Sequence, residues 1–512
     1  MRFRASTIAA VVVVVLSASF QARAIGASTT KTPEADGESF SFVDKDIISS
    51  ERGVLRTLHP GHQLSIPVLE AQEPWESKRI NIETVLYDAQ SGRFRMWYTS
   101  HLSNLKNIQD RLVPRLRNNN GCLVLYATSK DGIHWNRPNL GLYRFDGSAQ
   151  NNIVYDMDSS SVIFDPQDAD PAKRYKMLGY RHGDKSGYYA AFSADGIHWA
   201  DYPKNPVLEF GDTIRAVRDP LTGRYFAFHK RPLNAGGDHD PLGGINKRVV
   251  WLSTSPDFQD WTKPQLVLAP DKEDDTWVLG PDQRTEFYDM SGFPYGRGFL
   301  GLLAVLQVTQ VQKKSAINAE NQSPVDGPVD IQLVYSRDGV EWKRFPDRCP
   351  IISHGKTGNF DGGMILFVAN TPVVYNDQTL VYYTGFKTTH GGSMPPKRAD
   401  VGLASWRLDG FVSLDGGSYG GEVETVPLSV SGNQLEINVD ASHGSACAEL
   451  LSEDGKVLPG YSMEDCVPVV SDEVHHVIHW KGKDALPNGH PLRFRFRLRD
   501  ASLYSFRILS SQ

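Results

Sequence analysis

The sequence predicts an all-β protein in which a five-bladed β-propeller is followed by a C-terminal β-sandwich. A motif of the form Ser-x-Asp-(Gly)-x-x-Trp recurs four times, at residues 129–135, 193–199, 255–261 and 336–342. An internal repeat of this size indicates an array of similar supersecondary units. Alternating aromatic and β-branched residues, bounded by Asp, Gly and Pro, predict that each unit is a small antiparallel sheet. The repeat ends near residue 415, where a different alternating pattern begins.

The N-terminal residues predict an export signal outside the fold. Two arginines precede an apolar stretch at residues 8–16, and Ala-Arg-Ala at 22–24 fits a cleavage site. The apolar stretch is too short to span a bilayer as a helix, although a retained N-terminal anchor is the alternative to cleavage. We therefore expect a signal peptide at 1–24, a disordered or extended lead-in at 25–50, and a secreted or periplasmic mature protein.

Five repeat units of four strands are expected at residues 51–415. In each unit an apolar first strand ends at a turn that begins with Asp or Asn, an aromatic second strand returns, and a third strand follows. The first strands are predicted at 82–87, 162–164, 214–217, 285–288 and 372–375. The turns of the first four units are expected to begin at Asp88, Asp165, Asp219 and Asp289. Five such units fall within the usual range of blade numbers.

The Asp-Gly-x-x-Trp segment itself is predicted to be scaffold. Asp and Gly favour a tight turn into the outer strand. The Trp offers a large apolar surface for packing between neighbouring blades. Its recurrence in four units argues for this structural role.

Residues 416–512 predict the β-sandwich. Short alternating stretches at 434–439, 446–451, 474–480 and 492–498 are separated by turns. No flexible Gly/Ser or Pro linker separates this module from the propeller, which favours packing against the propeller over an independent binding module.

Neither the cysteines nor the spacing of potential metal ligands along the chain indicates a cofactor. Of the four cysteines, Cys447 and Cys466 could pair in an oxidising compartment, whereas Cys122 and Cys349 are predicted to be buried thiols. No Cys-x-x-Cys or His-Glu-x-x-His spacing is present, so we expect no zinc ligands. We expect no cofactor. A structural Ca²⁺ ion near the Asp-rich loops is the exception left open, although no loop has EF-hand spacing.

The repeated blades, the export signal and the C-terminal sandwich together make the chain resemble the five-bladed propeller glycoside hydrolases. Family 32, the invertase and inulinase group, has the same propeller-plus-sandwich layout, and family 43 shares the propeller. The resemblance covers the chain from about Glu51. It implies cleavage of a glycosidic bond by acidic residues on the innermost strands. The Trp-x-Asn-Asp-Pro-x-Gly and Glu-Cys motifs of family 32 are absent, so no site residue is carried over by motif.

Glycoside hydrolysis requires two carboxyl groups, one as acid and one as nucleophile or base, and a third often tunes their pKa values. In a propeller these groups come from innermost strands, just before each hairpin turn. The expected catalytic residues are Glu83, Asp212, Glu286 and Asp361. Glu83, Asp212 and Glu286 form the expected acidic triad, and Asp361 or Asp158 would replace a member of it. Glu286 is favoured as the acid and Glu83 as the base or nucleophile. The alternative for each is a solvated loop carboxylate or the partner of a nearby arginine.

Charged side chains at strand ends are expected to bind the substrate, namely Asp158, Arg181, His182, Arg215, His229, Arg231 and Arg284. With His390, the cationic members could hold an anionic sugar, such as a sulfated or uronic unit, by charge-assisted hydrogen bonds. Pairing with the site carboxylates or coating of the surface is the alternative of equal weight. Trp75 and Trp277 are candidates to stack on sugar rings, with core packing at least as well supported.

These observations predict a secreted glycosidase that acts on a neutral or anionic poly- or oligosaccharide. A non-catalytic glycan-binding propeller is the alternative. A glycoside phosphorylase is another, because His229-Lys230-Arg231 could hold a phosphate. The net charge of −6 provides neither a basic stripe for nucleic acid nor a polybasic membrane anchor. We therefore expect no nucleic-acid or membrane partner, and the oligomeric state stays open.

Overall fold

A computed structural model of the chain describes residues 39–102, 121–182, 185–209, 211–233, 247–312, 323–392, 397–483, 485–487 and 489–510. Its regular structure is almost entirely antiparallel β-sheet, broken by short 3-10 turns such as η1 (Pro74–Glu76) and η3 (Pro171–Lys173). The all-β class predicted from the sequence is confirmed. The predicted signal peptide at 1–24 lies outside the described residues. Within the described ranges, no helix has the length and hydropathy needed to cross a membrane.

Five antiparallel sheets of four or five strands follow one another along the chain, and we call them blades I to V. Blade I contains β5 (Ile80–Asp88), β6 (Arg93–His101), β7 (Cys122–Ser129), β8 (Trp135–Asn136) and β9 (Ile153–Tyr155). Blade II contains β10 (Asp158–Phe164), β11 (Tyr175–Arg181), β12 (Gly187–Ser193), β13 (Ala200–Asp201) and β14 (Leu208–Glu209). Blade III contains β15 (Ile214–Arg218), β16 (Tyr225–Pro232), β17 (Arg248–Ser255) and β18 (Gln265–Leu268).

The last two blades are built in the same way. Blade IV contains β19 (Arg284–Tyr295), β20 (Gly298–Val308), β23 (Val329–Ser336), β24 (Trp342–Arg344) and β25 (Pro350–Ile352). Blade V contains β26 (Met364–Val368), β27 (Val373–Tyr375), β28 (Gln378–Phe386), β29 (Ala399–Arg407) and β4 (His62–Gln63). A separate ribbon pairs β21 (Gln310–Val311) with β22 (Val325–Asp326) between the second and third strands of blade IV.

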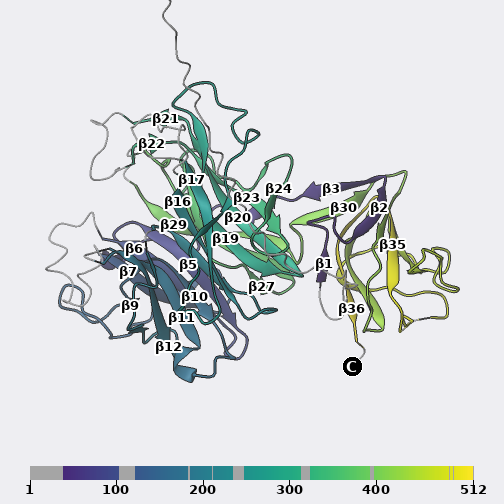
Figure 1. Cartoon of the computed structure of the whole chain (residues 1–512), viewed down its shortest axis with the longest axis horizontal. Coiled ribbons are helices and arrows are strands. Elements are labelled where there is room, and N and C mark those ends of the chain that lie inside the picture. The colour runs from purple at the N-terminus through teal and green to yellow at the C-terminus, as the bar shows by residue number, and fades with distance from the viewer. Residues whose placement is uncertain are drawn as a thin grey trace, which may run out of the picture.

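The first strands of the five blades form a closed ring. β5 contacts β10, β10 contacts β15, β15 contacts β19, β19 contacts β26, and β26 returns to β5. This is the arrangement of a five-bladed propeller, and it makes up the larger body of the molecule (Figure 1). Apolar side chains fill the space between neighbouring blades, as Trp97 and Met177 do between blades I and II. β4 precedes blade I in the sequence but pairs with β29, so it joins the two ends of the ring.

The repeated Trp motif forms a turn that connects each of blades I to IV to a neighbouring blade. In blade I the Ser129 hydroxyl accepts a hydrogen bond from the Gly132 N–H at 2.9 Å, and Asp131 accepts from two further backbone N–H groups. Gly132 has a φ of 77°, which glycine adopts at little cost. The Trp135 indole donates to the Gly132 carbonyl, and its ring packs edge-on against Tyr382 of blade V. The second and fourth motifs repeat these turn hydrogen bonds.

Replacing Gly196, in the second motif, by alanine is expected to destabilise the protein more than the same change at Gly92. Both glycines have positive φ, 76° and 62°, so both variants incur about 1–2 kcal/mol of backbone strain. A methyl group at Gly196 would lie 2.7 Å from the Trp97 ring, whereas no described atom lies within 4 Å at Gly92. Overpacking therefore adds about 1–3 kcal/mol at Gly196 alone. Denaturant unfolding of both variants measures the difference, and equal losses would contradict the packing role of this turn.

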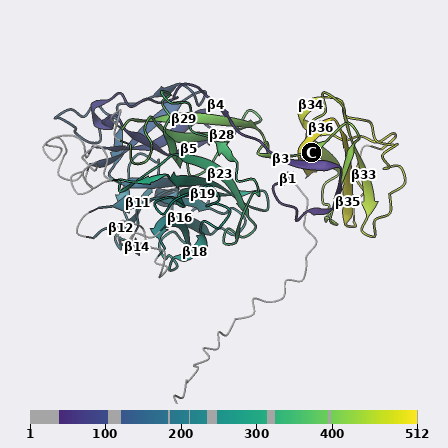
Figure 2. The same cartoon turned by 90° about the horizontal axis from the view of Figure 1, so that it is seen from above.

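Two further sheets form the smaller body beside the propeller (Figures 1 and 2). One contains β3 (Val54–Leu58), β30 (Val412–Gly416), β36 (Ala501–Leu509), β32 (Gln434–Asp440) and β34 (Asp472–Val477), with β1 (Ser39–Ser41) paired to β36. The other contains β2 (Ile48–Arg52), β31 (Gly421–Thr425), β35 (Leu492–Arg499) and β33 (Ser445–Ser452). Side chains from both sheets share one apolar core, which includes Leu435, Phe494 and Phe506.

The limits of this smaller body differ from the predicted 416–512. β1 lies in the predicted lead-in at 25–50, β2 extends past its end to Arg52, and β3 lies in the segment assigned to the propeller. All three pair with strands from the C-terminal part of the chain, and β30 begins before residue 416. The sequence pattern did not reveal this pairing because the whole propeller separates the partners.

All four cysteines are free thiols in this structure. Cys122 is buried, as predicted, but the prediction for Cys349 is wrong, because it is exposed in the turn before β25. Cys447 and Cys466 are hydrogen-bonded neighbours in the smaller body. Their oxidation to a disulfide in an oxidising compartment stays a prediction.

Candidate functional site

One edge of the propeller ring collects most of the predicted site residues. In an antiparallel blade the first strand begins where the second strand ends, so these ends share one edge in every blade. Glu83, Asp158 and Glu286 lie in the first half of β5, β10 and β19, and Asp212 lies just before β15. His182 directly follows β11 at the same edge. We call this group of side chains the ring-edge site.

Glu83 is almost fully buried within the ring-edge site, with an exposed fraction of 1%. A bulge in β5 at this position interrupts the pairing with β6. The Thr99 hydroxyl lies 2.6 Å from Oε1, and Nη1 of Arg215 donates to Oε2 at 2.5 Å. Burial raises the pKa of Glu83 to about 8, against the Arg215 charge and the Thr99 hydrogen bond, and the Asp158 charge adds to the rise. Glu83 therefore holds a proton at neutral pH.

Arg215 links Glu83 to a residue that the sequence analysis misplaced. Its Nε donates to Asp289 at 2.8 Å, and all three side chains are buried. Asp289 was predicted to begin a turn, but β19 continues through it to Tyr295, so that prediction is wrong. Arg215 was expected to bind substrate and is instead fully enclosed. One guanidinium group faces two buried carboxyl groups, so a proton on Glu83 relieves the excess negative charge.

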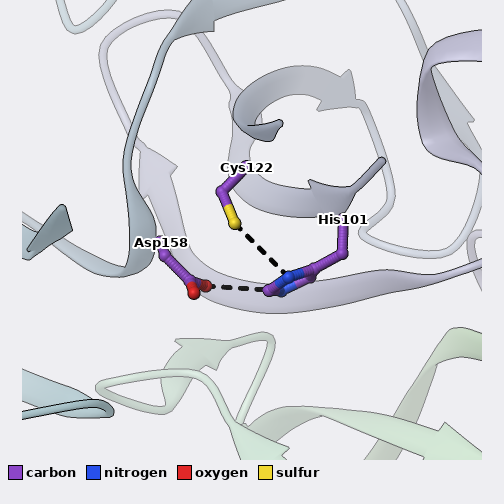
Figure 3. Close-up of side chains that lie close together, drawn as sticks. All are labelled: His101, Cys122 and Asp158. Atoms are coloured by element: carbon purple, nitrogen blue, oxygen red, sulfur yellow. Dashed lines mark hydrogen bonds and ion pairs between the residues drawn. The ribbon is translucent and has the colours of Figure 1, made fainter. Parts of the chain in front are cut away.

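Asp158 lies between two imidazole groups. Nε2 of His101 is 3.3 Å from one carboxylate oxygen, and Nε2 of His182 is 3.3 Å from the other. Burial opposes the charged form, yet His101, His182 and the nearby Arg79 charge hold the pKa of Asp158 below its usual value. On its other side, His101 contacts Cys122, with 3.4 Å between Nδ1 and Sγ (Figure 3).

His101 and Cys122 were not among the predicted site residues. The two are direct cross-strand partners where β6 ends and β7 begins, at the end of the strand pair that the intervening chain connects. Their sequence separation carries no metal or catalytic motif, and only the strand register brings them together. A sequence signal was available in principle, because the second strand of a blade was expected to end near this edge.

Asp212 is the most exposed of the four carboxyl groups of the ring-edge site, with 57% of its side chain accessible. Nζ of Lys230 lies 2.5 Å from Oδ2 of Asp212 and 3.7 Å from the centroid of the Tyr288 ring. The Lys230 charge is thus shared between a carboxylate and an aromatic face.

Glu286 is fully buried and held by two guanidinium groups. Nε of Arg284 donates to Oε1 at 2.7 Å, and Nη1 of Arg248 donates to Oε2. The Arg248 guanidinium also lies over the Tyr288 ring, 5.2 Å from its centroid. Arg284, which was expected to bind substrate, is therefore engaged with a buried carboxylate.

Asp361 lies just before β26, the first strand of blade V, and therefore at the same edge of the ring as the other four carboxyl groups. It lies in the segment between β25 and β26, where the Tyr383 hydroxyl donates to it at 3.0 Å. Burial raises its pKa, against the Tyr383 hydrogen bond and the nearby His354 charge. Within the described part of the chain, its side-chain contacts link it to blade V and not to the ring-edge site.

The predicted cationic residues serve mainly internal contacts. Arg181 forms ion pairs with Asp156 and Asp201. His229 and His390 are buried, and burial is the largest cause that lowers the pKa of each. Arg231 lies near the end of β16 and is partly exposed, and its charge also lowers the pKa of His229. Of the cationic residues that were expected to hold an anionic sugar, His182 and Arg231 are therefore the accessible ones.

The two tryptophans proposed to stack on sugars both donate hydrogen bonds inside the protein. The Trp75 indole N–H donates to Asn152 at 2.8 Å, and the Trp277 indole N–H donates to Thr285 at 3.0 Å. Trp75 also packs edge-on against Phe145. These hydrogen bonds favour core packing over stacking on sugar rings for both tryptophans.

The stability of the protein is expected to fall on acidification because of His229. Burial lowers the pKa of His229 to about 3, whereas the unfolded chain takes up this proton near pH 6.5. Above pH 6.5 both states are neutral at this group; below it only the unfolded state gains a proton, so stability falls. The loss reaches about 3 kcal/mol at pH 4.5. Denaturant unfolding of wild type and His229→Phe at pH 7 and 4.5 measures it.

The exposed His134, in the first Trp motif, supplies the control. His134→Phe should lose as much stability on acidification as wild type, whereas His229→Phe should lose about 3 kcal/mol less. An identical loss in all three proteins would show that His229 is not held neutral.

Neither a family model nor a curated protein sequence matches the chain. Solved structures give distant similarities. An N-acetylgalactosamine deacetylase from F. plautii, in complex with blood group B trisaccharide, is 15% identical over 70% of this chain and 96% of that one, with a TM-score of 0.41. A β-1,2-mannobiose phosphorylase from Listeria innocua is 12% identical over 68% and 96%, with a TM-score of 0.40. A family 32 β-fructofuranosidase from Bombyx mori is 11% identical over 87% and 95%, with a TM-score of 0.38. At these values the similarities carry no argument about activity, which rests on the site itself.

Proposed function

We propose that the chain is a glycoside hydrolase whose reaction takes place at the ring-edge site. The observation that carries this proposal is the pair of Glu83 and Asp158, whose pKa values are moved in opposite directions. The protonated Glu83 supplies the acid that cleavage of a glycosidic bond requires, and the ionised Asp158 near it favours that protonated form.

In this proposal Glu83 donates the proton to the leaving-group oxygen, and the exposed Asp212 acts as nucleophile or base. Asp158 keeps Glu83 protonated through its negative charge. The acid role expected for Glu286 thus passes to Glu83, because Glu286 is enclosed by Arg248 and Arg284 and is better suited to hold them in place.

A non-catalytic glycan-binding propeller is the second candidate, and the charge pairing at the site favours it. Lys230 pairs with Asp212, and Arg248 and Arg284 pair with Glu286, so most charges are already neutralised within the protein. The same pairing weakens the phosphorylase alternative, because Lys230 is engaged by a carboxylate and not left to hold phosphate. We also propose that the protein acts outside the cytoplasm, on the basis of its N-terminal export pattern.

Incubation with a panel of neutral and anionic polysaccharides in heavy-oxygen water tests the proposal. Hydrolysis places one heavy oxygen at the new reducing end, phosphorolysis gives a sugar phosphate, and binding alone gives neither. The proposal expects labelled sugar from at least one polysaccharide. Retention of a glycan without any release would assign the binding function instead.

A further inference from the structure

His101, Cys122 and Asp158 form a compact cluster, of which the proposed hydrolysis uses only Asp158 (Figure 3). One ligand atom from each residue can be chosen so that all lie within 4.8 Å of one another. Sγ of Cys122 is 3.4 Å from Nδ1 of His101, and Nε2 of His101 is 3.3 Å from Asp158. We infer that this cluster binds a single divalent transition-metal ion of the zinc class.

The types of ligand atom select the ion. Thiolate and imidazole suit Zn²⁺ and the neighbouring transition metals, whereas Ca²⁺ and Mg²⁺ prefer all-oxygen sites. In a tetrahedral site, ligand bonds to Zn²⁺ of about 2.0–2.3 Å place two ligand atoms about 3.3–3.8 Å apart. The ligand atoms lie within 4.8 Å of one another, so ion binding requires them to approach by up to about 1.5 Å.

The backbone holds the three residues at fixed places. His101 is the last residue of β6, Cys122 is the first residue of β7, and the two are direct cross-strand partners. Asp158 begins β10 in the neighbouring blade, where the pairing with β11 is interrupted by a bulge. The next residue, Ser159, has a φ of 43°, and such strained positions are concentrated at functional sites.

Outer contacts of the kind found around metal ligands are also present. His182 lies 3.3 Å from the second oxygen of Asp158. The Asn81 side-chain amide lies 3.0 Å from Nε2 of His101, and Asn81 is 1% exposed. Its Oδ1 has no hydrogen-bond partner among the described residues. If the Asn81 side-chain amide is flipped, its Oδ1 accepts a hydrogen bond from the Nε2–H of His101. The Nδ1 lone pair of His101 is then available to an ion beside Cys122.

Three protein ligands leave one position of a tetrahedral ion for water or a sugar hydroxyl, as in catalytic zinc sites. A nucleophilic role for Cys122 fits the surroundings less well, because the thiol is 4% exposed. Binding of the ion displaces the thiol proton, so uptake releases a proton and strengthens as the pH rises.

Cobalt(II) titration of the reduced, chelator-treated full chain tests the site. A cobalt–thiolate bond gives an intense near-ultraviolet absorption, which identifies the cysteine ligand directly. We expect saturation at about one equivalent and displacement by Zn²⁺. Cys122→Ser should abolish the absorption and weaken binding at least about 100-fold, and His182→Gln should keep the absorption and weaken binding about 10-fold.

The other cysteines supply matched controls, and Asp158→Asn supplies a second ligand variant if Cys122→Ser does not fold. Cys349→Ser and Cys447→Ser should bind cobalt as wild type does, and Asp158→Asn should keep the absorption at reduced affinity. Absence of saturable uptake, or an absorption that survives Cys122→Ser and disappears in Cys447→Ser, would overturn the assignment. The readout uses no glycan, so its failure leaves the hydrolase proposal standing.

Discussion

Replacing Arg215 by leucine is expected to lower the free energy of unfolding by about 5 kcal/mol, at the upper end for a broken buried ion pair. Arg215 is fully buried and donates to Glu83 of β5 and Asp289 of β19. Its removal leaves Asp289 buried without a cation beside the already protonated Glu83, so Asp289 must become protonated as well. The defect should therefore be larger at pH 8 than at pH 5, since deprotonation of the unfolded chain lowers stability as the pH rises. Denaturant unfolding at both pH values measures it.

Arg218→Leu is the matched control, because Arg218 lies on the same strand and pairs with Asp165 at 3.2 Å, with 24% of its side chain exposed. A partly exposed pair contributes about 1 kcal/mol or less. If Arg215→Leu costs no more than Arg218→Leu, the buried trio does not hold blades I, III and IV together at the ring.

Replacing Glu83 by glutamine is expected to reduce kcat/KM at least about 100-fold on any glycan that wild type cleaves, since it removes the proton donor. Wild-type activity should persist below pH 8 and fall as the pH rises through the pKa of Glu83, about 8, because a general acid must carry its proton. Asp158→Asn removes a charge that helps to raise this pKa. In chelator-treated protein, the activity of Asp158→Asn should therefore fall at a lower pH than that of wild type, on the alkaline limb of the pH–activity profile.

Glu341→Gln, at an exposed position in the fourth Trp motif, controls for the loss of a carboxylate. Its activity and its pH profile should match those of wild type. Full activity of Glu83→Gln would show that Glu83 is not the proton donor. An unshifted alkaline limb in Asp158→Asn would show that the Asp158 charge does not raise the pKa of Glu83.

The blades were predictable because the repeat is local. The turn around Asp131 and Gly132 is built from contacts within a few residues, so the residues that form it stand together in the sequence. The strands at the chain ends were not predictable in this way. β3 pairs with β30 across the whole propeller, and no local pattern encodes that partner.

The carboxyl groups of the site were predictable as a class from their places on the first strands of the blades, and Glu83 also from a strand face that would otherwise be apolar. Their environments were not. Arg215 reaches Glu83 from blade III, and the predicted turn at Asp289 concealed the third member of the trio. His101 and Cys122 were missed because strand register, and not sequence spacing, places them opposite each other.

The central claim is that carboxyl groups at the ring edge cleave a bound glycan, and parallel measurement of binding and sugar release tests it most directly. Wild type, Glu83→Gln, Asp212→Asn and the exposed control Asp260→Asn would be compared on the best substrate from the panel. The account predicts dissociation constants within about threefold of wild type, with release reduced at least about 100-fold in the first two variants only. Binding without release by wild type, or unchanged release by both site variants, would contradict it.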